Sequence, residues 1–338
     1  MSSPTGGRAG GRPPTPTDPR PEPASFHDLR GSLSLGLVQV TEAAALAAAR
    51  LAGRGDADRV KAAGASAMLS ALEELGFQGR VVLAPRGDRV LSHGSMVGPA
   101  DAPLLDLGVY PVEGASVVAR GLANAISVLA AVQPDTFPSL AAVWYVEKIV
   151  VGPAARGAID LDDSLTDNLR RIAFARDARV SDLVVAVLDR PRHQEILEEV
   201  RAAGARVLML EEGEIAGAVM AAAPGSGVDA MVGIGGLQET VIAAAAVRCL
   251  GGDVQARLWP RNDEERLLAG VDSERKYGVA DLAPADLGVA VTGVTGGQLL
   301  KGVWFGATHA ETHSLTMSTR RATVRQIITR HHRVGEPG

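Results

Sequence analysis

The sequence predicts an α/β protein in which helices cover a layered sheet. Apolar runs at residues 183–188, 206–210 and 230–234 have the length and composition of buried strands, and the segments between them, 192–203 and 215–223, have helical spacing. Strands that alternate with helices in this way are typical of a layered α/β fold. The hydrophobic content of 46% is enough for a sizeable core, and the aromatic content of only 3% indicates that Ala, Val, Leu and Ile build it.

The N-terminal part of the chain divides into a tail and two helices. Residues 1–32 contain many Pro, Gly, Ser and Thr residues and few large apolar ones, so we expect them to bury too little surface to offset the entropy of ordering and to be disordered. An Ala-rich helix is predicted to begin with Thr41 as its cap and to end near Gly53. A second helix is predicted over residues 58–75, ending at Gly76.

The remaining elements are strands separated by turns that contain Gly or Pro. We expect strands at residues 80–84, 104–107, 129–132, 141–151 and 288–292. Residues 312–330 alternate polar and apolar side chains, which is typical of antiparallel strands. Because no repeat or linker interrupts the pattern, residues 33–333 are expected to form one compact unit of two lobes, followed by a short tail at 334–338.

Charge and composition narrow the class of protein. The formal net charge is −5 and aromatic residues are few, so a general nucleic-acid binder is not expected. The basic stretch at 320–333 is short and interleaved with apolar residues, and we interpret it as a charged edge strand. Cys249 is the only cysteine, which excludes an intrachain disulfide and fits a reducing compartment. No apolar run is long enough for a membrane span and no apolar signal core begins the chain, so a cytoplasmic protein without a membrane partner is predicted.

The strongest candidate for a functional turn follows the apolar strand at 104–107. The strand runs into Pro111, after which a carboxylate at Glu113 and a glycine at Gly114 precede small residues that favour a helix. Because the first N–H groups of a helix lack partners and attract anions, Gly114 and the two residues after it could seat a phosphate while Glu113 holds a cation. The alternative is an ordinary turn between a strand and a helix.

Further segments occur in a characteristic order along the chain. They include Gly53-Arg-Gly-Asp56, Tyr145-Val-Glu-Lys148, Arg190-Pro-Arg-His193, Gly233-Ile-Gly-Gly236 and Val291-Thr-Gly-Val-Thr295. Together they resemble the class II fructose-1,6-bisphosphatases, the bacterial branch of the sugar-phosphate and inositol-phosphate phosphatase superfamily, and the resemblance covers residues 35–332. It implies a layered αβαβα sandwich of two lobes, a divalent cation such as Mg²⁺ or Mn²⁺, a homo-oligomer (dimer or tetramer), and hydrolysis of the 1-phosphate of fructose 1,6-bisphosphate.

Hydrolysis of this kind depends on metal ions, because phosphate monoesters react very slowly unaided and a hard cation both neutralises phosphoryl oxygens and activates water. The resemblance implies five carboxylates around the metal, of which Glu113 and Glu239 are present. The other three positions hold Lys61, Pro85 and Tyr110. Two glutamates beside a lysine bind a divalent cation poorly, since the lysine repels it. Catalysis is therefore predicted to be impaired.

The phosphate-binding side matches the family better. The resemblance assigns substrate contacts to Glu113, Gly114, Ala115, Tyr145, Arg190, Arg192, Glu212, Gly213, Glu214 and Gly236, and a catalytic role to Glu239. Arginine suits such a site because its guanidinium forms paired hydrogen bonds with phosphate, although a solvated loop is the alternative for Arg190 and Arg192. His193 is expected to be structural, and the histidines near the C-terminus lack ligand spacing.

Two hypotheses for the function follow. In the first, the protein is a working sugar-phosphate phosphatase in which Glu113, Glu239 and another acid such as Asp88 hold one metal ion. In the second, metal-dependent hydrolysis is lost and the protein binds a sugar phosphate, with Lys61 and Arg86 as fixed cations in place of the metal. The replaced carboxylates favour the second hypothesis.

Overall fold

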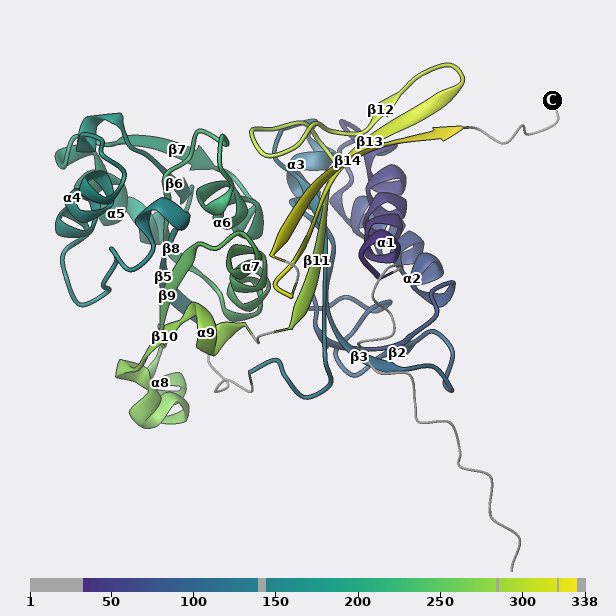
Figure 1. The fold of residues 1–338 in the computed structure, drawn as a ribbon, viewed down its shortest axis with the longest axis horizontal. Coiled ribbons are helices and arrows are strands. Elements are labelled where there is room, and N and C mark those ends of the chain that lie inside the picture. The colour runs from purple at the N-terminus through teal and green to yellow at the C-terminus, as the bar shows by residue number, and fades with distance from the viewer. Residues whose placement is uncertain (1–32, 139–143, 284–285, 321, 333–338) are drawn as a thin grey trace, which may run out of the picture.

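The structure is a computed structural model that describes residues 33–138, 144–283, 286–320 and 322–332. Within these ranges the chain forms an αβαβα sandwich, in which two sheets alternate with layers of helices (Figure 1). This confirms the predicted fold class. The predicted tails at 1–32 and 334–338, and residues 141–143 of a predicted strand, lie outside the described residues.

The first sheet has eight strands in the order β12-β13-β11-β4-β3-β1-β2, with β14 paired to β13. The strands are β1 (Gln78–Leu83), β2 (Met96–Val97), β3 (Leu104–Glu113), β4 (Ile126–Val132), β11 (Leu287–Gly293), β12 (Trp304–Phe305), β13 (His309–Ser318) and β14 (Thr323–His332). β1 and β3 are parallel, whereas the other neighbours are antiparallel. The antiparallel pair β13–β14 confirms the prediction made from the alternation at 312–330.

The second sheet has six strands in the order β10-β9-β5-β8-β6-β7. The strands are β5 (Tyr145–Val151), β6 (Val184–Leu188), β7 (Arg206–Leu210), β8 (Ala230–Gly236), β9 (Asp253–Leu258) and β10 (Lys276–Gly278). β6 is parallel to both β7 and β8, and β5 is antiparallel to β8 and β9. The three apolar runs at 183–188, 206–210 and 230–234 therefore lie in this one sheet, whereas the predicted strand at 288–292 is β11 of the first sheet.

Helices cover both outer faces and fill the space between the sheets (Figure 1). The long helices are α1 (Leu33–Ala49) and α2 (Ala57–Glu73) against the first sheet, α6 (Glu214–Ala222) and α7 (Leu237–Cys249) between the sheets, and α4 (Leu165–Ala175) and α5 (Gln194–Ala202) outside the second sheet. The short helices are α3 (Ala115–Ala119), α8 (Asp263–Ala269) and α9 (Val279–Leu282), with 3₁₀ turns η1 (Pro153–Ala155), η2 (Val180–Asp182), η3 (Pro191–His193) and η4 (Gly270–Glu274).

Strand β4 shows why the interior strands are uninterrupted apolar runs. Ile126 and Val128 belong to the core between the two sheets, whereas Leu129 and Ala131 belong to the core beneath α1 and α2. Every residue of β4 is buried, because a helical layer covers each face of the sheet. Burying an Ile, Val or Leu side chain stabilises the fold by about 1.5–3 kcal/mol relative to exposure.

The first helix begins earlier than the sequence predicts. α1 starts at Leu33, so the prediction that Thr41 caps it is wrong. Leu37 is fully buried in the core beneath α1 and α2, and packing of this kind extends the helix towards the N-terminus. In the middle of the helix, the Thr41 hydroxyl donates to the Val38 carbonyl oxygen (3.0 Å) and lies 2.7 Å from the Thr292 hydroxyl, so it is satisfied within the core.

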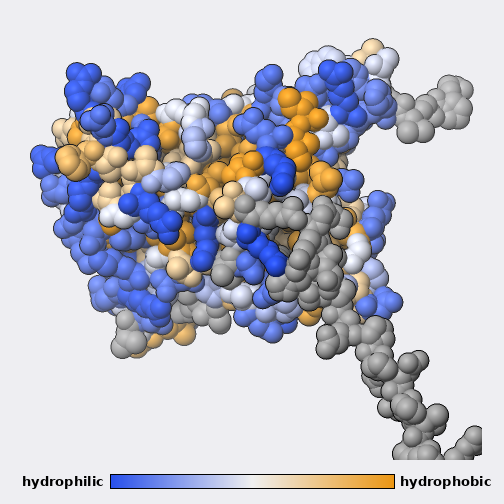
Figure 2. Space-filling view, viewed as in Figure 1, coloured by the Kyte–Doolittle hydropathy of each residue, from blue (hydrophilic) through white to orange (hydrophobic). Residues whose placement is uncertain are grey.

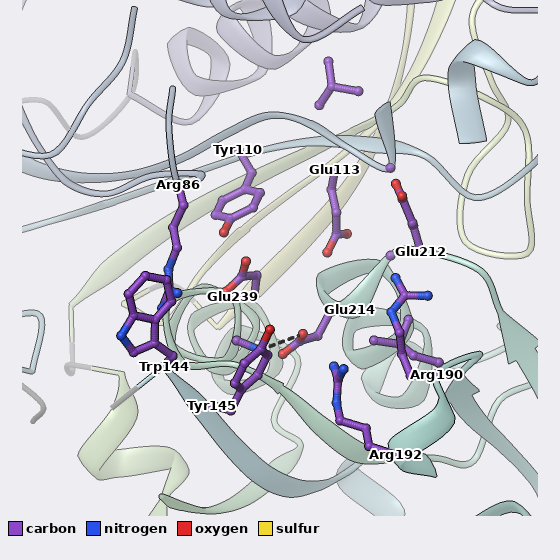
Figure 3. A pocket seen from close by; sticks show the side chains of 15 residues that line it. Arg86, Tyr110, Glu113, Trp144, Tyr145, Arg190, Arg192, Glu212, Glu214 and Glu239 are labelled. Carbon is purple, nitrogen blue, oxygen red and sulfur yellow. Dashed lines mark hydrogen bonds between the residues drawn. The ribbon is translucent and has the colours of Figure 1, made fainter. Parts of the chain in front are cut away.

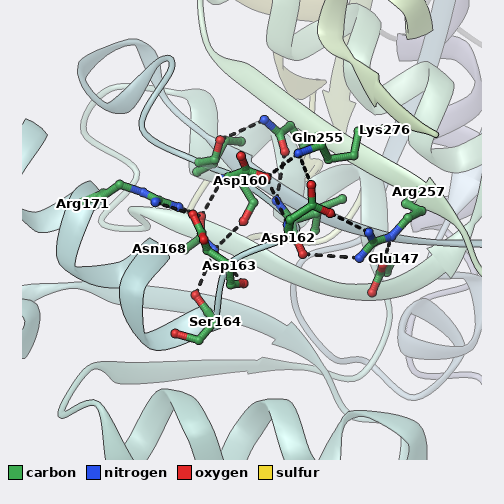
Figure 4. A network of polar contacts seen from close by, with 12 residues as sticks. Glu147, Asp160, Asp162, Asp163, Ser164, Asn168, Arg171, Gln255, Arg257 and Lys276 are labelled. Atoms are coloured by element: carbon green, nitrogen blue, oxygen red, sulfur yellow. Dashed lines mark hydrogen bonds and ion pairs between the residues drawn. The ribbon is translucent and has the colours of Figure 1, made fainter. Parts of the chain in front are cut away.

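The segment that precedes α4 is fixed to the second sheet by ion pairs (Figure 4). Lys276 on β10 donates to Asp160 (2.6 Å) and to Asp162. Arg257 on β9 donates to Glu147 (2.6 Å) and to Asp162 (2.8 Å). The hydrogen bond from Lys276 holds the pKa of Asp160 below its usual value. Each of these carboxylates is paired with a cation on a strand of the second sheet. These ion pairs therefore hold the loop against the sheet.

The molecular surface carries both hydrophilic and apolar residues. The face in Figure 2 is hydrophilic around the side of α4 and α5 and carries apolar residues nearer its middle. Exposed large apolar side chains in the described ranges are spread over several elements, such as Phe174 on α4, Leu267 on α8 and Ile328 on β14. Scattered exposure of this kind is ordinary for a folded protein. No described helix has the length and hydropathy needed to cross a membrane.

Candidate functional site

A pocket of about 320 Å³ opens between the two sheets, where β3 ends and β5, α6 and α7 begin. Its lining residues are Arg86, Tyr110, Val112, Glu113, Gly114, Trp144, Tyr145, Leu188, Arg190, Arg192, Glu212, Gly213, Glu214, Gly236 and Glu239. Figure 3 shows carboxylates in the centre of the pocket, with Arg86 on one side and Arg190 and Arg192 on another. We call this the central pocket.

Most residues predicted to contact substrate lie in the central pocket. All of them except Ala115 line it, and Glu239 lines it as well. Ala115 is buried in α3. The structure thus brings together side chains from both halves of the chain, and their individual roles stay predictions.

Glu113, the last residue of β3, caps a helix that lies far along the chain. One carboxylate oxygen accepts a hydrogen bond from the Ile215 N–H (2.6 Å) and the other from the Ala216 N–H (2.9 Å). These N–H groups lie in the first turn of α6 and have no partner within the helix. Burial raises the pKa of Glu113 to about 8, although the two backbone N–H groups favour the ionised form. Both oxygens of Glu113 are therefore engaged with α6.

Glu214, the first residue of α6, is held by a buried lysine. Lys148 on β5 is only 2% exposed and donates to Glu214 and to the Thr240 hydroxyl (3.1 Å). The other oxygen of Glu214 accepts from the Gly236 N–H (3.0 Å). A buried charge needs such partners because it has lost its hydration. Glu214 thus lines the pocket, and the buried Lys148 holds it from behind.

Glu239, in the first turn of α7, shares a hydrogen bond with the Tyr110 hydroxyl. Burial raises the pKa of Glu239, and the charge of nearby Glu214 raises it further. Burial also raises the pKa of Tyr110, so this hydroxyl keeps its proton and serves as a donor. Tyr110 therefore occupies one of the predicted carboxylate positions as a hydrogen-bond partner of the glutamate that remains.

Two glycines let these carboxylates lie against the backbone. A Cβ atom at Gly235 would lie 2.1 Å from the Glu214 Oε2 atom, and one at Gly236 would lie 1.9 Å from the Glu239 Oε2 atom. A side chain at either position would displace the carboxylate that now fills the space of its Cβ atom. The Gly-Gly step at the end of β8 thus leaves room for the acidic side chains around it.

The arginines of the pocket are anchored to carbonyl oxygens or stacked on aromatic rings. Arg190 donates to the Glu211 carbonyl oxygen (2.8 Å), and Arg192 donates to the Ile234 carbonyl oxygen (2.9 Å). The Arg192 guanidinium lies 5.0 Å from the centre of the Tyr145 ring. These contacts leave donors on each guanidinium for an anion, since arginine carries five N–H groups.

On the opposite side of the pocket, Arg86 stacks on Trp144. The Arg86 Cζ atom lies 3.3 Å from the centre of the Trp144 ring, and Arg261 lies 4.9 Å from the same centre. Arg86 follows β1 of the first sheet, whereas Trp144 and Arg261 flank strands of the second sheet. Cation–π contacts therefore connect the two sheets at the edge of the pocket.

The turn predicted to seat a phosphate is partly occupied by a protein group. The Ser116 hydroxyl donates to the Glu212 carboxylate (2.7 Å). Gly114 has a φ of 87°, which favours glycine, and Gly213 likewise has a φ of 105°. The strand, turn and helix expected here are confirmed as β3 and α3, whereas phosphate binding at this turn stays a prediction.

Lys61 and Pro85 line a different, neighbouring hollow. Lys61 lies on the exposed side of α2, 3.6 Å from Asp58. Asp88 also lines this hollow, but its Oδ1 atom accepts the N–H groups of Val90 (2.8 Å) and Leu91 (3.1 Å). The predicted grouping of Asp88 with Glu113 and Glu239 is not found in the central pocket.

His193 has the structural environment that the sequence suggests. Its side chain is fully buried, with Nδ1 at 2.8 Å from the Leu188 carbonyl oxygen and Nε2 accepting from the Ile234 N–H (2.8 Å). Burial lowers the pKa of His193, so the ring stays neutral. The ring joins the ends of β6 and β8 through Leu188 and Ile234.

Sequence reasoning missed the roles of Lys148, which holds a lining residue in place, and of Trp144, which lines the pocket itself. Lys148 lies on a strand that is mostly buried, and a buried lysine requires an acidic partner, so the signal was present. Trp144 directly precedes the predicted Tyr145, but nothing in the sequence indicates that its ring meets Arg86 from the other sheet.

The acidic residues of the pocket are close in space but are engaged by protein donors. Among the residues that the structure describes, no three His, Cys, Asp or Glu side chains are placed to hold a metal ion together. An array of carboxylates and arginines with mixed charge can instead bind the phosphate and hydroxyl groups of a polar small molecule.

An αβαβα sandwich with arginines and carboxylates in a pocket between its sheets has the features of a protein that binds a polar small molecule. A sequence model of the family described as bacterial fructose-1,6-bisphosphatase, glpX-encoded, matches residues 31–331. The class 2 fructose-1,6-bisphosphatase of Haemophilus influenzae is 38% identical over 322 residues, which cover 89% of this chain and 96% of that protein. Fructose-1,6-bisphosphatase 1 class 2 of Escherichia coli K12 is 34% identical over 325 residues, covering 90% of this chain and 96% of the relative. The chain belongs to the class II fructose-1,6-bisphosphatase family, which confirms the resemblance seen in the sequence.

Proposed function

We propose that this protein binds a sugar phosphate in the central pocket and hydrolyses fructose 1,6-bisphosphate slowly or not at all. The observation that carries the proposal is the engagement of Glu113. Both of its carboxylate oxygens accept hydrogen bonds from the first turn of α6. A cation that drew Glu113 away from α6 would leave buried N–H groups without a partner, at a cost of about 1–3 kcal/mol for each group.

The other expected ligand positions support the same proposal. Pro85 and Tyr110 carry no carboxylate, and Lys61 brings a positive charge to the adjacent hollow. Glu239 shares its hydrogen bond with Tyr110. Mg²⁺ in such sites is usually held by one or two carboxylates, and both glutamates that remain here already bond to protein donors, so we infer that this donor set does not fit the divalent ion of the family.

Phosphate binding does not depend on that ion. Arg190 and Arg192 approach the pocket from one side and Arg86 from another (Figure 3). Guanidinium groups bind phosphate oxygens in charge-assisted pairs without a metal. The carboxylates of Glu212 and Glu239 can accept hydrogen bonds from sugar hydroxyl groups.

The test is release of phosphate from fructose 1,6-bisphosphate by the purified protein with Mn²⁺, alongside the Haemophilus influenzae relative as positive control. We expect a rate lower by at least about 1,000-fold, since losing about 4 kcal/mol of metal stabilisation in the transition state has that effect. In EDTA, fructose 6-phosphate is expected to raise the melting temperature of the wild type, and less so that of Arg192→Ser. Rapid metal-dependent hydrolysis, or absence of ligand stabilisation in EDTA, would contradict the proposal.

A working fructose-bisphosphatase is the second candidate function. The specific observation in its favour is 38% identity that extends over 96% of a relative named as that enzyme. In this case Glu239 would be catalytic and Glu113 would leave α6 to ligate the metal. A rate comparable with that of the control enzyme, abolished by Glu239→Gln, would establish it. Assembly into a dimer or tetramer stays a prediction under both candidates.

A further inference from the structure

A cavity of about 550 Å³ lies at the C-terminal end of α7, whereas the central pocket lies at the N-terminal end of the same helix. Among the described residues, none lines both cavities. Arg156, which follows β5 of the second sheet, lies in its wall, and so do Thr319 and Val324 around the turn between β13 and β14 of the first sheet. The last turn of α7 and the start of α9 supply most of the rest. We call this the α7 cavity.

The charged side chains in the wall of the α7 cavity are two arginines. Arg156 is exposed, and Arg248 is half-buried in the last turn of α7. The described residues of the wall include no Asp or Glu, and in this part of the chain neither arginine has an ion-pair partner. Arg248 donates to the Ala283 carbonyl oxygen (2.5 Å), which leaves further N–H donors on its guanidinium. Two cations without an acid in the same wall favour an anion.

The end of α7 that carries Arg248 is held in place by its surroundings. The Gly251 N–H donates to the Arg248 carbonyl oxygen (3.1 Å). The Gly252 N–H donates to the Val247 carbonyl oxygen (3.0 Å), and together the two bonds close the last turn of the helix. A Cβ atom at Gly252 would lie 2.5 Å from the Val151 carbonyl oxygen, so the chain packs directly on the end of β5. The bonds also engage carbonyl oxygens that would otherwise repel an anion at this helix end.

The remainder of the wall is largely apolar. Leu250 and Val279 line it, and so does Val324, which is 45% exposed. Apolar surface beside two guanidinium groups suits a ligand that combines an anionic group with an apolar body. A phosphate monoester carries close to two negative charges at neutral pH, which match two arginines, and guanidinium groups bind its oxygens in paired hydrogen bonds.

We propose that the α7 cavity binds a phosphate monoester with an apolar substituent, held by Arg156 and Arg248, as a second ligand that does not compete with the one in the central pocket. Arg248 lies about 14 Å along the helix axis from Glu239, at 1.5 Å per residue. Both ligands therefore fit on the protein together. The second ligand requires neither a metal ion nor sugar hydroxyl groups.

Cys249 provides a local readout, because it lines the α7 cavity and is the only cysteine of the chain. Burial raises the pKa of its thiol to about 12, so alkylation by iodoacetamide is slow and can be followed by mass spectrometry at about pH 9. Phenyl phosphate, added to the full chain at about ten times its Kd, should slow this alkylation about tenfold. In Arg156→Ser the same concentration of phenyl phosphate should leave the rate nearly unchanged.

Two variants that remove the same charge elsewhere are the controls. Arg201→Ser, at an exposed position on α5, and Arg192→Ser, in the central pocket, should both keep the protection of Cys249. Benzyl alcohol, which has a ring but no charge, should give none. Equal protection by benzyl alcohol, or protection that persists in Arg156→Ser, overturns the inference.

Calorimetric titration with phenyl phosphate is an independent test that does not need a reactive thiol. In the Arg192→Ser background, the further changes Arg156→Ser and Arg248→Ser should weaken binding about 10- to 100-fold, whereas adding Arg201→Ser should leave it within about twofold. Absence of binding in the Arg192→Ser protein, or unchanged affinity in the triple variant, overturns the inference. Neither result affects the proposed function, which concerns the central pocket alone.

Discussion

The surroundings of Glu113 determine both its charge and the groups that its carboxylate can bind. In the folded protein its pKa is raised from 4.5 to about 8, mainly by burial. Between pH 4.5 and about pH 8, Glu113 is protonated in the folded state and ionised in the unfolded chain. The contribution of Glu113 to stability is therefore largest below pH 4.5, the pKa of the unfolded chain. This contribution is lost as the pH rises through the folded-state value.

This titration yields a prediction at the residue scale. The free energy of unfolding of the wild type should fall relative to that of Glu113→Gln, by up to about 1.4 kcal/mol per pH unit between about pH 5 and pH 8. Urea denaturation of both proteins across this range measures the difference. Glu195→Gln, at an exposed position on α5, is the control and should follow the wild type. A pH-independent difference between wild type and Glu113→Gln would show that Glu113 stays ionised throughout.

The sequence predicted that Glu113 belongs to a functional turn, but not which group it contacts. Its partners Ile215 and Ala216 lie 102 and 103 residues further along the chain. The local pattern of Pro, Glu and Gly indicates the turn, because neighbouring residues determine the backbone geometry of a turn. The hydrogen bonds to α6 depend on how two sheets stack, and no local pattern contains that information.

At the scale of single elements, the packing of α2 against β3 can be tested by adding one methyl group. Gly64→Ala removes a helix-destabilising glycine, which by itself would stabilise α2 by up to about 1 kcal/mol. The new Cβ atom would, however, lie 2.4 Å from the Val112 Cγ2 atom. We expect the clash to prevail and the free energy of unfolding to fall by about 1–3 kcal/mol in chemical denaturation.

The matched variant for this prediction is the double substitution Gly64→Ala with Val112→Ala. Removing the valine methyl groups makes room for the new Cβ atom, so the two changes should destabilise less than the sum of the single variants. Additive effects would mean that α2 and β3 adjust separately and that Lys61 is not held in place by this contact.

Elements with a strong pattern were predicted well, and those decided by packing were not. The second helix was predicted at 58–75 and is observed as α2, whose N-cap Asp56 accepts the Arg59 N–H. For α1 the sequence offered Thr41 as a plausible cap, but the buried residues before it continue the helix to Leu33. Short strands such as β2, β10 and β12 have only two or three residues, too few for a periodic signal.

For the whole molecule, the engaged carboxylates predict that folding does not depend on a divalent ion. A site with micromolar affinity would stabilise the protein by about 4 kcal/mol at about 1 mM Mn²⁺. We expect a far smaller effect, with nearly equal melting temperatures in EDTA and in Mn²⁺. Differential scanning calorimetry measures both conditions, and the Escherichia coli relative provides the comparison. A large stabilisation by Mn²⁺ would show that Glu113 and Glu239 rearrange to accept the ion.

The layered α/β class followed from alternation alone, because strands buried on both faces must be continuously apolar, as β4 is. The order of the strands did not follow. β11 lies beside β4, although all six strands of the second sheet intervene along the chain. The residues that line the pocket likewise come from distant parts of the chain, between Arg86 and Glu239. They could be named from family resemblance, whereas their hydrogen bonds required the structure.

The stack of Arg86 on Trp144 gives the protein a built-in optical signal. Trp144 is one of three tryptophans, and its ring centre lies 3.3 Å from the Arg86 Cζ atom, at the edge of the central pocket. The emission of an indole ring responds to charge and polarity close to its face. A ligand that draws the guanidinium away from the ring would therefore change the fluorescence of the unlabelled protein, and its arrival could be followed in real time with no chemistry taking place.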